Sequence, residues 1–116
     1  MNKLSKKPEF VQKGLKGYRF EVKNKAIEVY LVNVTTGHDS YIISKKCTHF
    51  YYVLEGRGFF DIEKKKIKVK KGNFIEIEPK KEYTYSGKMK LLLMMNPPWF
   101  LGNETIIRKN PKVYEK

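Results

Sequence analysis

The sequence of 116 residues contains little cysteine, little arginine and no long apolar stretch. Its one cysteine, Cys47, cannot form a disulfide within the chain, which is typical of the reducing cytoplasm. No apolar run approaches the ~18 residues that a membrane-spanning helix needs. The basic first residues are not followed by the apolar segment of a signal peptide. We therefore expect a cytoplasmic protein with no membrane partner.

Acidic residues are also scarce, since 25 lysines and arginines stand against 12 aspartates and glutamates, for a formal net charge of +13. A charge of this size can indicate a nucleic-acid partner. Only three of the basic residues are arginines, however, and arginine is the residue best suited to forked contacts with phosphates and bases. The lysines alternate with apolar residues in the segment 64–72, KKKIKVKKG, as on a solvated strand. This pattern favours a solvated surface over a nucleic-acid site.

Helical periodicity is missing as well, because apolar residues recur mostly at every second position along the chain. Tyr18 and Phe20 alternate with charged residues, and Ile27, Val29 and Leu31 share one face of the next segment. Glycine, proline, asparagine or lysine clusters follow every ~8–12 residues, including 56–58 and 86–87, and we expect turns there. The sequence predicts an all-β protein of short antiparallel strands with no helix. We expect a single domain over residues 1–116, with a barrel core at about 17–100. The flanking N- and C-terminal segments are expected to be loosely ordered or to add an edge strand.

Two spaced motifs in the segment 35–98 carry a family resemblance. The first motif begins with a glycine, and five residues separate that glycine from a His-x-His sequence. Three or four further residues lead to a glutamate, and six more residues lead to a second glycine. From Gly37 this spacing leads to Ile43, Lys45, His49 and Gly56, within the words "YYVLEGRG". From Gly72 the second motif leads to Glu78, Lys80 and Tyr83, with a proline one place late at Pro79. The chain thereby resembles the cupin superfamily, which implies a small jelly-roll β-barrel.

The resemblance implies that the metal-ligand positions of cupins hold Ile43, Lys45, His49 and Tyr83 here. Isoleucine offers no donor and a protonated lysine repels a cation, whereas a divalent ion needs three or four converging donors. We therefore predict no metal site and no cofactor. One alternative stays open, in which His38 and an acid complete a metal site with His49. The candidate acids are Asp61, Glu76 and Glu78.

The same positions predict an organic-ligand site. Residues of one parity on a strand face one side, and in a cupin barrel that side is the interior. On this basis the ligand-binding candidates are Ile43, Lys45, Cys47, Tyr51 and Tyr85, with His49 and Tyr83 as catalytic candidates. Lys45 would hold an anion. His49 and Tyr83 would move a proton next to a carbonyl group, as implied by the metal-free keto-sugar epimerases and isomerases of the superfamily.

The functional hypothesis is a barrel that binds a small polar or anionic molecule, a sugar or a carboxylate, as a metal-independent isomerase or epimerase. A non-catalytic binding or sensor module is a second hypothesis, and a metal-dependent cupin enzyme using His49 is a third. Trp99 and Phe100 follow the rigid Pro97-Pro98 pair and either close the barrel or pack on a partner subunit. We expect a homodimer on this basis.

Overall fold

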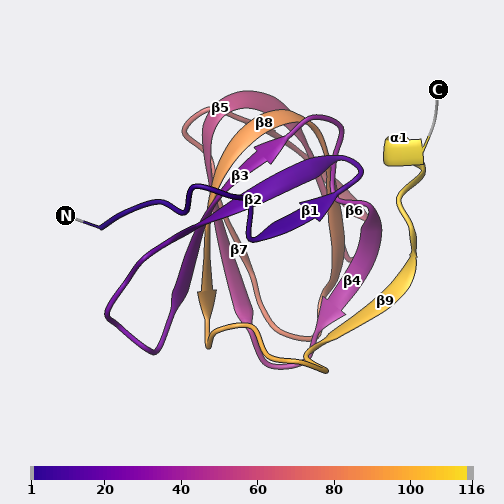
Figure 1. Cartoon of the computed structure of the whole chain (residues 1–116). Helices are drawn as coiled ribbons and strands as arrows, with labels where there is room; N and C mark the ends of the chain where they lie inside the picture. Colours follow the sequence, from indigo (N-terminus) through magenta and orange to yellow (C-terminus); the bar gives the residue numbers. More distant parts are fainter. Residues whose placement is uncertain (1, 115–116) are drawn as a thin grey trace.

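The computed structural model describes residues 2–114 and confirms the all-β prediction. The described residues form antiparallel strands of one sheet that curls round on itself, followed by a single helical turn (Figure 1). The elements are β1 (Phe10–Gln12), β2 (Leu15–Phe20), β3 (Glu28–Val34), β4 (Ser40–Ser44), β5 (Thr48–Ile62), β6 (Lys65–Lys70), β7 (Phe74–Ile77), β8 (Glu82–Asn96), β9 (Glu104–Lys109) and α1 (Pro111–Tyr114).

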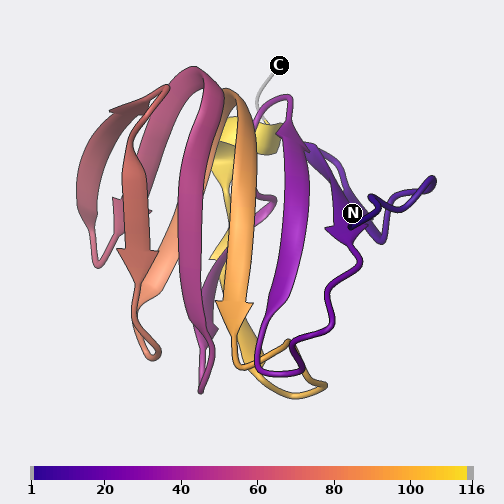
Figure 2. The same ribbon diagram turned by 90° about the vertical axis from the view of Figure 1, so that its left-hand side faces the viewer.

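The two long strands β5 and β8 are the framework of the barrel. They pair with each other along almost their whole length, from Thr48↔Asn96 to Ile62↔Tyr83. On the far side of β8, its C-terminal half pairs with β3 and its N-terminal end with β4, whereas β7 and β6 extend the sheet beyond β5. Two walls result, with the order β1-β2-β3-β8-β5-β7 in one and β9-β4-β8-β5-β6 in the other (Figure 2). The interior lies between these walls.

The expected turns at 56–58 and 86–87 are wrong, because these glycines lie inside β5 and β8. Gly58 is the direct partner of Gly87 where the two strands run side by side. A Cβ atom on Gly87 would lie 2.6 Å from the carbonyl oxygen of Arg57, and its φ of +126° is open to glycine. A Cβ on Gly58 would collide with the carbonyl oxygen of Ser86. The glycines therefore allow close approach within long curved strands instead of ending short ones.

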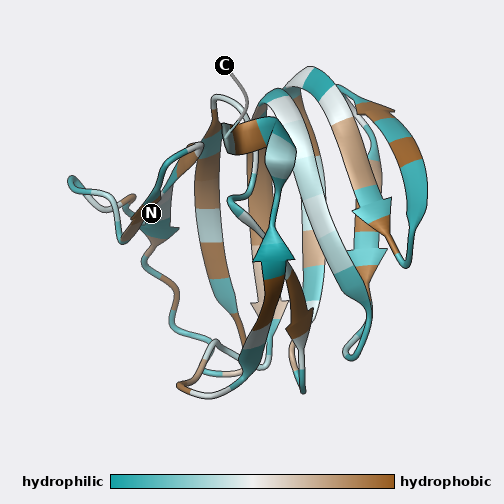
Figure 3. Cartoon of the chain, turned by 90° about the vertical axis from the view of Figure 1, so that its right-hand side faces the viewer, coloured by the Kyte–Doolittle hydropathy of each residue, from teal (hydrophilic) through white to brown (hydrophobic). Residues whose placement is uncertain are grey.

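Strand periodicity decides which side chains reach the interior, and Figure 3 shows apolar and polar residues alternating along the strands. On β5 the buried residues His49, Tyr51 and Val53 share the predicted parity. On β3 the buried face is Glu28, Tyr30, Val32 and Val34, so Val29 and Leu31 are on the partly exposed face. Polar groups of β3 therefore enter the interior beside an otherwise apolar core.

Both flanking segments add edge strands, which was the second of the two structures expected for them. β1 pairs with β2 and β9 pairs with β4. The turn α1 was not predicted, and it follows the buried Asn110. The side-chain amide of Asn110 donates to the carbonyl oxygens of His38 and Tyr85, at 3.0 and 3.1 Å, and so attaches the tail to the barrel. Among the described residues, no helix has the length and apolar character to cross a membrane.

Candidate functional site

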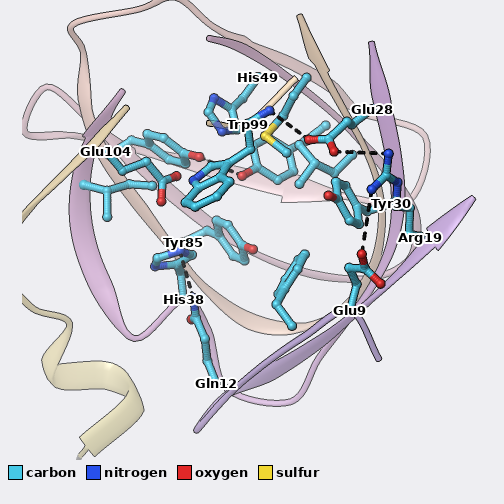
Figure 4. A pocket seen from close by; sticks show the side chains of 16 residues that line it. Glu9, Gln12, Arg19, Glu28, Tyr30, His38, His49, Tyr85, Trp99 and Glu104 are labelled. Atoms are coloured by element: carbon cyan, nitrogen blue, oxygen red, sulfur yellow. Dashed lines mark hydrogen bonds and ion pairs between the residues drawn. The ribbon is translucent and has the colours of Figure 1, made fainter. Parts of the chain in front are cut away.

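A cavity of about 490 Å³ opens between the two walls of the barrel. Side chains from both termini and from the central strands converge on it (Figure 4). Its lining is aromatic and polar, with these residues: Glu9, Phe10, Gln12, Arg19, Glu28, Tyr30, His38, Ile42, His49, Tyr51, Tyr83, Tyr85, Leu93, Met95, Trp99 and Glu104. Aromatic walls with a few converging polar groups are typical of a small-molecule site.

The inner part of the cavity is formed by His49 and Tyr51 of β5 and by Tyr83 and Tyr85 of β8. We call these four residues the histidine–tyrosine cluster. All four are at most 2% exposed, and the hydroxyl groups of Tyr51 and Tyr83 share a hydrogen bond of 2.7 Å. The His49 ring lies 5.7 Å from the Tyr83 ring and 6.2 Å from the Tyr51 ring, between centroids. Two adjacent long strands thus bring together the residues that the sequence assigned to one site.

Burial controls protonation in this cluster. It lowers the pKa of His49 to about 4, against the opposing effect of the Cys47 backbone carbonyl, so the imidazole is neutral near pH 7. It raises the pKa of Tyr51, Tyr83 and Tyr85 well above their usual value, so the phenols keep their protons. Within residues 2–114, Nδ1 of His49 is the buried side-chain nitrogen or oxygen that has no hydrogen-bond partner. Buried polar groups are normally satisfied, so this nitrogen is unusual. The Cys47 backbone carbonyl is the neighbouring acceptor that acts on the ring.

His38 reaches the cavity from the turn before β4, and its hydrogen bonds define its tautomer. The side-chain oxygen of Gln12 accepts from the Asp39 N–H at 3.0 Å, so the Gln12 amide nitrogen points to Nε2 of His38, 3.3 Å away. Nε2 is then the acceptor, and Nδ1–H donates to the Ser40 carbonyl at 2.8 Å. The Ser40 N–H lies 3.2 Å from the same Nδ1, and in this tautomer that longer contact is not a hydrogen bond. Burial lowers the pKa of His38, so this histidine is also neutral near pH 7.

The outer part of the cavity is charged, and we call Glu9, Arg19, Trp99 and Glu104 the rim. The Arg19 guanidinium lies 3.7 Å from Glu9 and 3.4 Å from the buried Glu28, between nitrogen and oxygen atoms. The other oxygen of Glu28 accepts from the Trp99 backbone N–H at 2.8 Å. Glu28 therefore connects β3 to the segment after β8 that carries Trp99.

The charged residues of the rim, and Glu28 beside it, were missed by sequence reasoning. Glu9, Arg19, Glu28 and Glu104 belong to no motif, and three of them come from segments treated as flanks or outward faces. The alternation on β3 could have flagged Glu28, because it shares parity with Tyr30 and Val32. Trp99 was expected to close the barrel or meet a partner, and it does line the cavity while 46% of its surface stays exposed.

The expectation that Ile43 and Lys45 face the interior is wrong. Lys45 is exposed in the turn between β4 and β5, and Ile43 lies on the partly exposed face of β4, outside the cavity. The inward residues of β4 are Ile42 and Ser44. The turn 45–47 shifts the parity between β4 and β5, so one alternation cannot be carried across both strands.

The remaining candidates differ in position. Cys47 is fully buried but does not line the cavity; its thiol contacts the Pro98 carbonyl, and burial raises its pKa, which opposes a role as nucleophile. Asp61 accepts a hydrogen bond from Tyr41 outside the cavity, and Glu76 and Glu78 are exposed. Among residues 2–114 no three His, Cys, Asp or Glu side chains gather in a way that could hold a metal ion. The described residues therefore provide no set of donors for the alternative metal site that combines His38 and His49 with an acid.

No protein-family model and no curated protein matches the sequence. Solved structures do match. An RmlC-like cupin from Shewanella frigidimarina superposes with a TM-score of 0.67 at 15% identity, over 84% of this chain and 85% of that one. This chain has a cupin-type fold. The resemblance inferred from the motif spacing is thereby confirmed at the level of the barrel.

Two further solved structures superpose on this barrel. Pac13 of Streptomyces, described as a nucleoside dehydratase, has a TM-score of 0.83 at 20% identity and covers 98% of this chain and 90% of its own. Structures of Pac13 variants in which a single tyrosine or histidine is replaced contain uridine. KdgF from Halomonas has a TM-score of 0.68 at 12% identity, over 78% of this chain and 84% of that one.

Proposed function

We propose that the cavity binds a small neutral, hydroxylated molecule of the sugar or nucleoside type and removes a proton from a carbon next to its carbonyl group. One observation carries this proposal: His49 is buried and neutral and lines the cavity beside the hydrogen-bonded Tyr51–Tyr83 pair. Neutral imidazole can accept a proton, and a phenol can donate one. The catalytic candidates remain His49 as the base and Tyr83 as the proton donor.

The charges of the lining favour a neutral ligand over the anionic one first expected. Lys45, the residue expected to bind an anion, lies outside the cavity. Glu9, Glu28 and Glu104 supply three carboxylates to the lining, and Arg19 supplies one cation. With both histidines neutral, a phosphate or carboxylate ligand would enter a cavity of net negative charge.

Two net reactions share the proposed first step. If the proton returns to the carbon or to its neighbour, the substrate is isomerised or epimerised. If the carbanion instead expels a neighbouring hydroxyl group, with a proton donated by Tyr83, water leaves and a dehydration results. The similarity to Pac13, a nucleoside dehydratase studied with uridine, favours the second outcome and a nucleoside-like ligand.

Proton abstraction can be tested before the net reaction is known. Ketoses, aldoses and aldehyde or ketone derivatives of uridine are incubated with the protein in heavy water, and deuterium at carbon is measured by mass spectrometry. We expect exchange by the natural protein and a loss of about 10²–10⁴-fold in His49→Gln, the range for a general base. Tyr41→Phe is the matched tyrosine control, because Tyr41 binds Asp61 outside the cavity. Absence of exchange with every probe would contradict the catalytic proposal.

A non-catalytic binding module is the second candidate, because a histidine of pKa about 4 is a weak base as well as a good hydrogen-bond acceptor. This candidate predicts that uridine or a neutral sugar raises the melting temperature without any exchange or turnover.

We also propose a cytoplasmic homodimer. β9 is an edge strand that pairs only with β4 among the described strands, and its six residues are all exposed. Ile106 is 71% exposed and the nearby Leu101 88%. An exposed apolar edge strand invites pairing with a second copy of the same strand. Light scattering tests this: we expect a dimer for the natural chain and a monomer for Ile106→Lys.

A further inference from the structure

Glu104 occupies a position in the cavity that is held firmly by its neighbour. Asn103 is fully buried, and its side chain accepts from the Lys46 N–H at 2.9 Å and donates to the Ser44 hydroxyl at 2.9 Å. Its carbonyl oxygen accepts from the Lys45 N–H at 2.8 Å. These bonds fix the first residue of β9, which pairs with Ser44 and directs the Glu104 side chain to the cavity (Figure 4).

The Glu104 carboxyl differs from the other carboxyl groups of the cavity in having no cation. Glu9 and Glu28 both pair with Arg19. The ion pairs formed among residues 2–114 do not include Glu104. Burial raises the pKa of this carboxyl, and a hydrogen bond from the Trp99 side chain opposes the rise. Two carboxylate oxygens have room for about four hydrogen bonds, so most of the acceptor capacity of Glu104 is available to a ligand.

This carboxylate lines the same cavity as the histidine–tyrosine cluster and lies close enough to act on its tyrosines. Its negative charge contributes to the raised pKa of Tyr51, Tyr83 and Tyr85, which line the same cavity. A ligand in this cavity could therefore contact both the cluster and Glu104. Glu104 is an exposed residue of β9 whose side chain lines the cavity. A carboxylate without a paired cation binds hydrogen-bond donors there and repels negative charge.

Resting on the function proposed above, we infer that Glu104 is the specificity-determining residue of the cavity. Its carboxylate accepts hydrogen bonds from the hydroxyl or ring N–H groups of a neutral ligand, and it disfavours ligands that carry a phosphate or carboxylate. The substrate class is thereby narrowed to nucleosides or free sugars and away from nucleotides or sugar phosphates.

Titration calorimetry of the full chain with uridine and with uridine 5′-monophosphate tests this inference. We expect the natural protein to bind uridine about 10-fold or more tightly than the phosphate. Glu104→Gln keeps the shape but removes the charge, and it is expected to weaken uridine binding about 10-fold, as for a lost hydrogen bond to a charged group. The preference for uridine over its phosphate should narrow at the same time.

Glu82→Gln is the matched control, because it removes one negative charge from a glutamate that pairs with Arg108 at 3.4 Å outside the cavity. It should leave both affinities unchanged. If Glu104→Gln does not fold, Glu104→Asp keeps the charge with a shorter reach and should weaken uridine binding while retaining the discrimination.

The outcomes separate this inference from the function on which it rests. If uridine binds the natural protein but Glu104→Gln changes neither affinity nor preference, the role of Glu104 is overturned and the proposed function stands. The same holds if the natural protein binds the phosphate as tightly as uridine. If neither uridine nor any neutral sugar binds, the proposed function fails and the inference fails with it.

Discussion

The histidine–tyrosine cluster and the rim are built from different parts of the chain. The cluster comes from β5 and β8, the two central strands that pair over almost their whole length, and its four side chains are at most 2% exposed. The rim comes from the first twenty residues, the segment after β8 and the edge strand β9, and Glu9, Arg19 and Trp99 are each about half exposed.

This difference separates two tasks of the site. In the cluster, burial holds His49 neutral and the tyrosines protonated, so protonation states are set by the fold itself. At the rim, charged groups stay accessible to solvent, where they can select an approaching ligand. We expect substitutions in the cluster to change the chemistry and the pH response, and substitutions in the rim to change affinity with smaller effects on folding.

The largest expected effect on stability comes from the titration of His49. Its pKa is about 4 in the folded protein and about 6.5 in the unfolded chain. Between these values the unfolded state binds a proton that the folded state does not, so the free energy of unfolding falls as the pH falls. The His49 contribution is about 3 kcal/mol over this interval. Denaturant unfolding of the natural protein and of His49→Gln at pH 7 and pH 4 measures it.

The difference in pH dependence between the natural protein and His49→Gln isolates His49, because the carboxyl groups titrate equally in both proteins. His38 adds a dependence of the same sign, since burial lowers its pKa as well, and it is present in both proteins. An equal loss of stability in the natural protein and the variant would show that His49 is already solvated or protonated in the fold, and the contrast between cluster and rim would disappear.

Tyr83→Phe tests the chemistry of the cluster. The substitution keeps the buried ring and removes the hydroxyl group that lies 2.7 Å from the Tyr51 hydroxyl. We expect a loss of about 10²-fold in the exchange or turnover rate, the lower range for a proton donor, with the substrate KM changed by much less. A rate within about twofold of the natural one, measured with the same substrate, would remove Tyr83 from the mechanism.

Asn103→Ala tests how the rim is held in place. The substitution removes both side-chain hydrogen bonds of a fully buried amide and leaves the Ser44 hydroxyl and the Lys46 N–H without that partner. We expect the unfolding free energy to fall by about 1–3 kcal/mol, and uridine to bind more weakly because Glu104 is no longer fixed. Thermal unfolding and calorimetry follow the two effects. Asn73→Ala, in an exposed turn, is the control.

The cluster was accessible to sequence reasoning and the charged residues of the rim were not, for physical reasons. Strand alternation places His49 and Tyr51 on one face whatever the rest of the chain does, and motif spacing identified the barrel. The prediction for Lys45 was wrong because the turn 45–47 shifts that alternation. The turns expected at Gly58 and Gly87 are absent because glycine also occurs where two strands approach each other closely.

The rim depends instead on long-range pairing. Arg19 meets Glu9 only because β1 folds back on β2, and it meets Glu28 only because β3 lies next to β2. Glu104 reaches the cavity through the pairing of β9 with β4, which no local pattern encodes. Contacts between segments that are distant in sequence produce no periodic pattern and no fixed spacing. They therefore cannot be recognised in a single sequence.

Arg19→Gln is expected to give the smallest effect on the exchange rate and sharpens the contrast most directly. Arg19 is 45% exposed, so the loss of its screened ion pair with Glu9 should change the unfolding free energy by no more than about 1 kcal/mol. The loss of its pair with the buried Glu28 adds to this cost, although Glu28 keeps the hydrogen bond from the Trp99 N–H. The rate of proton exchange should stay within a few-fold of the natural value, because Arg19 contacts no member of the histidine–tyrosine cluster through an ion pair or a hydrogen bond within residues 2–114. The variant does leave the cavity more negative, which should further weaken binding of uridine 5′-monophosphate relative to uridine. Improved binding of the phosphate would mean that Arg19 does not offset the carboxylates, and that the rim does not select its ligand by charge.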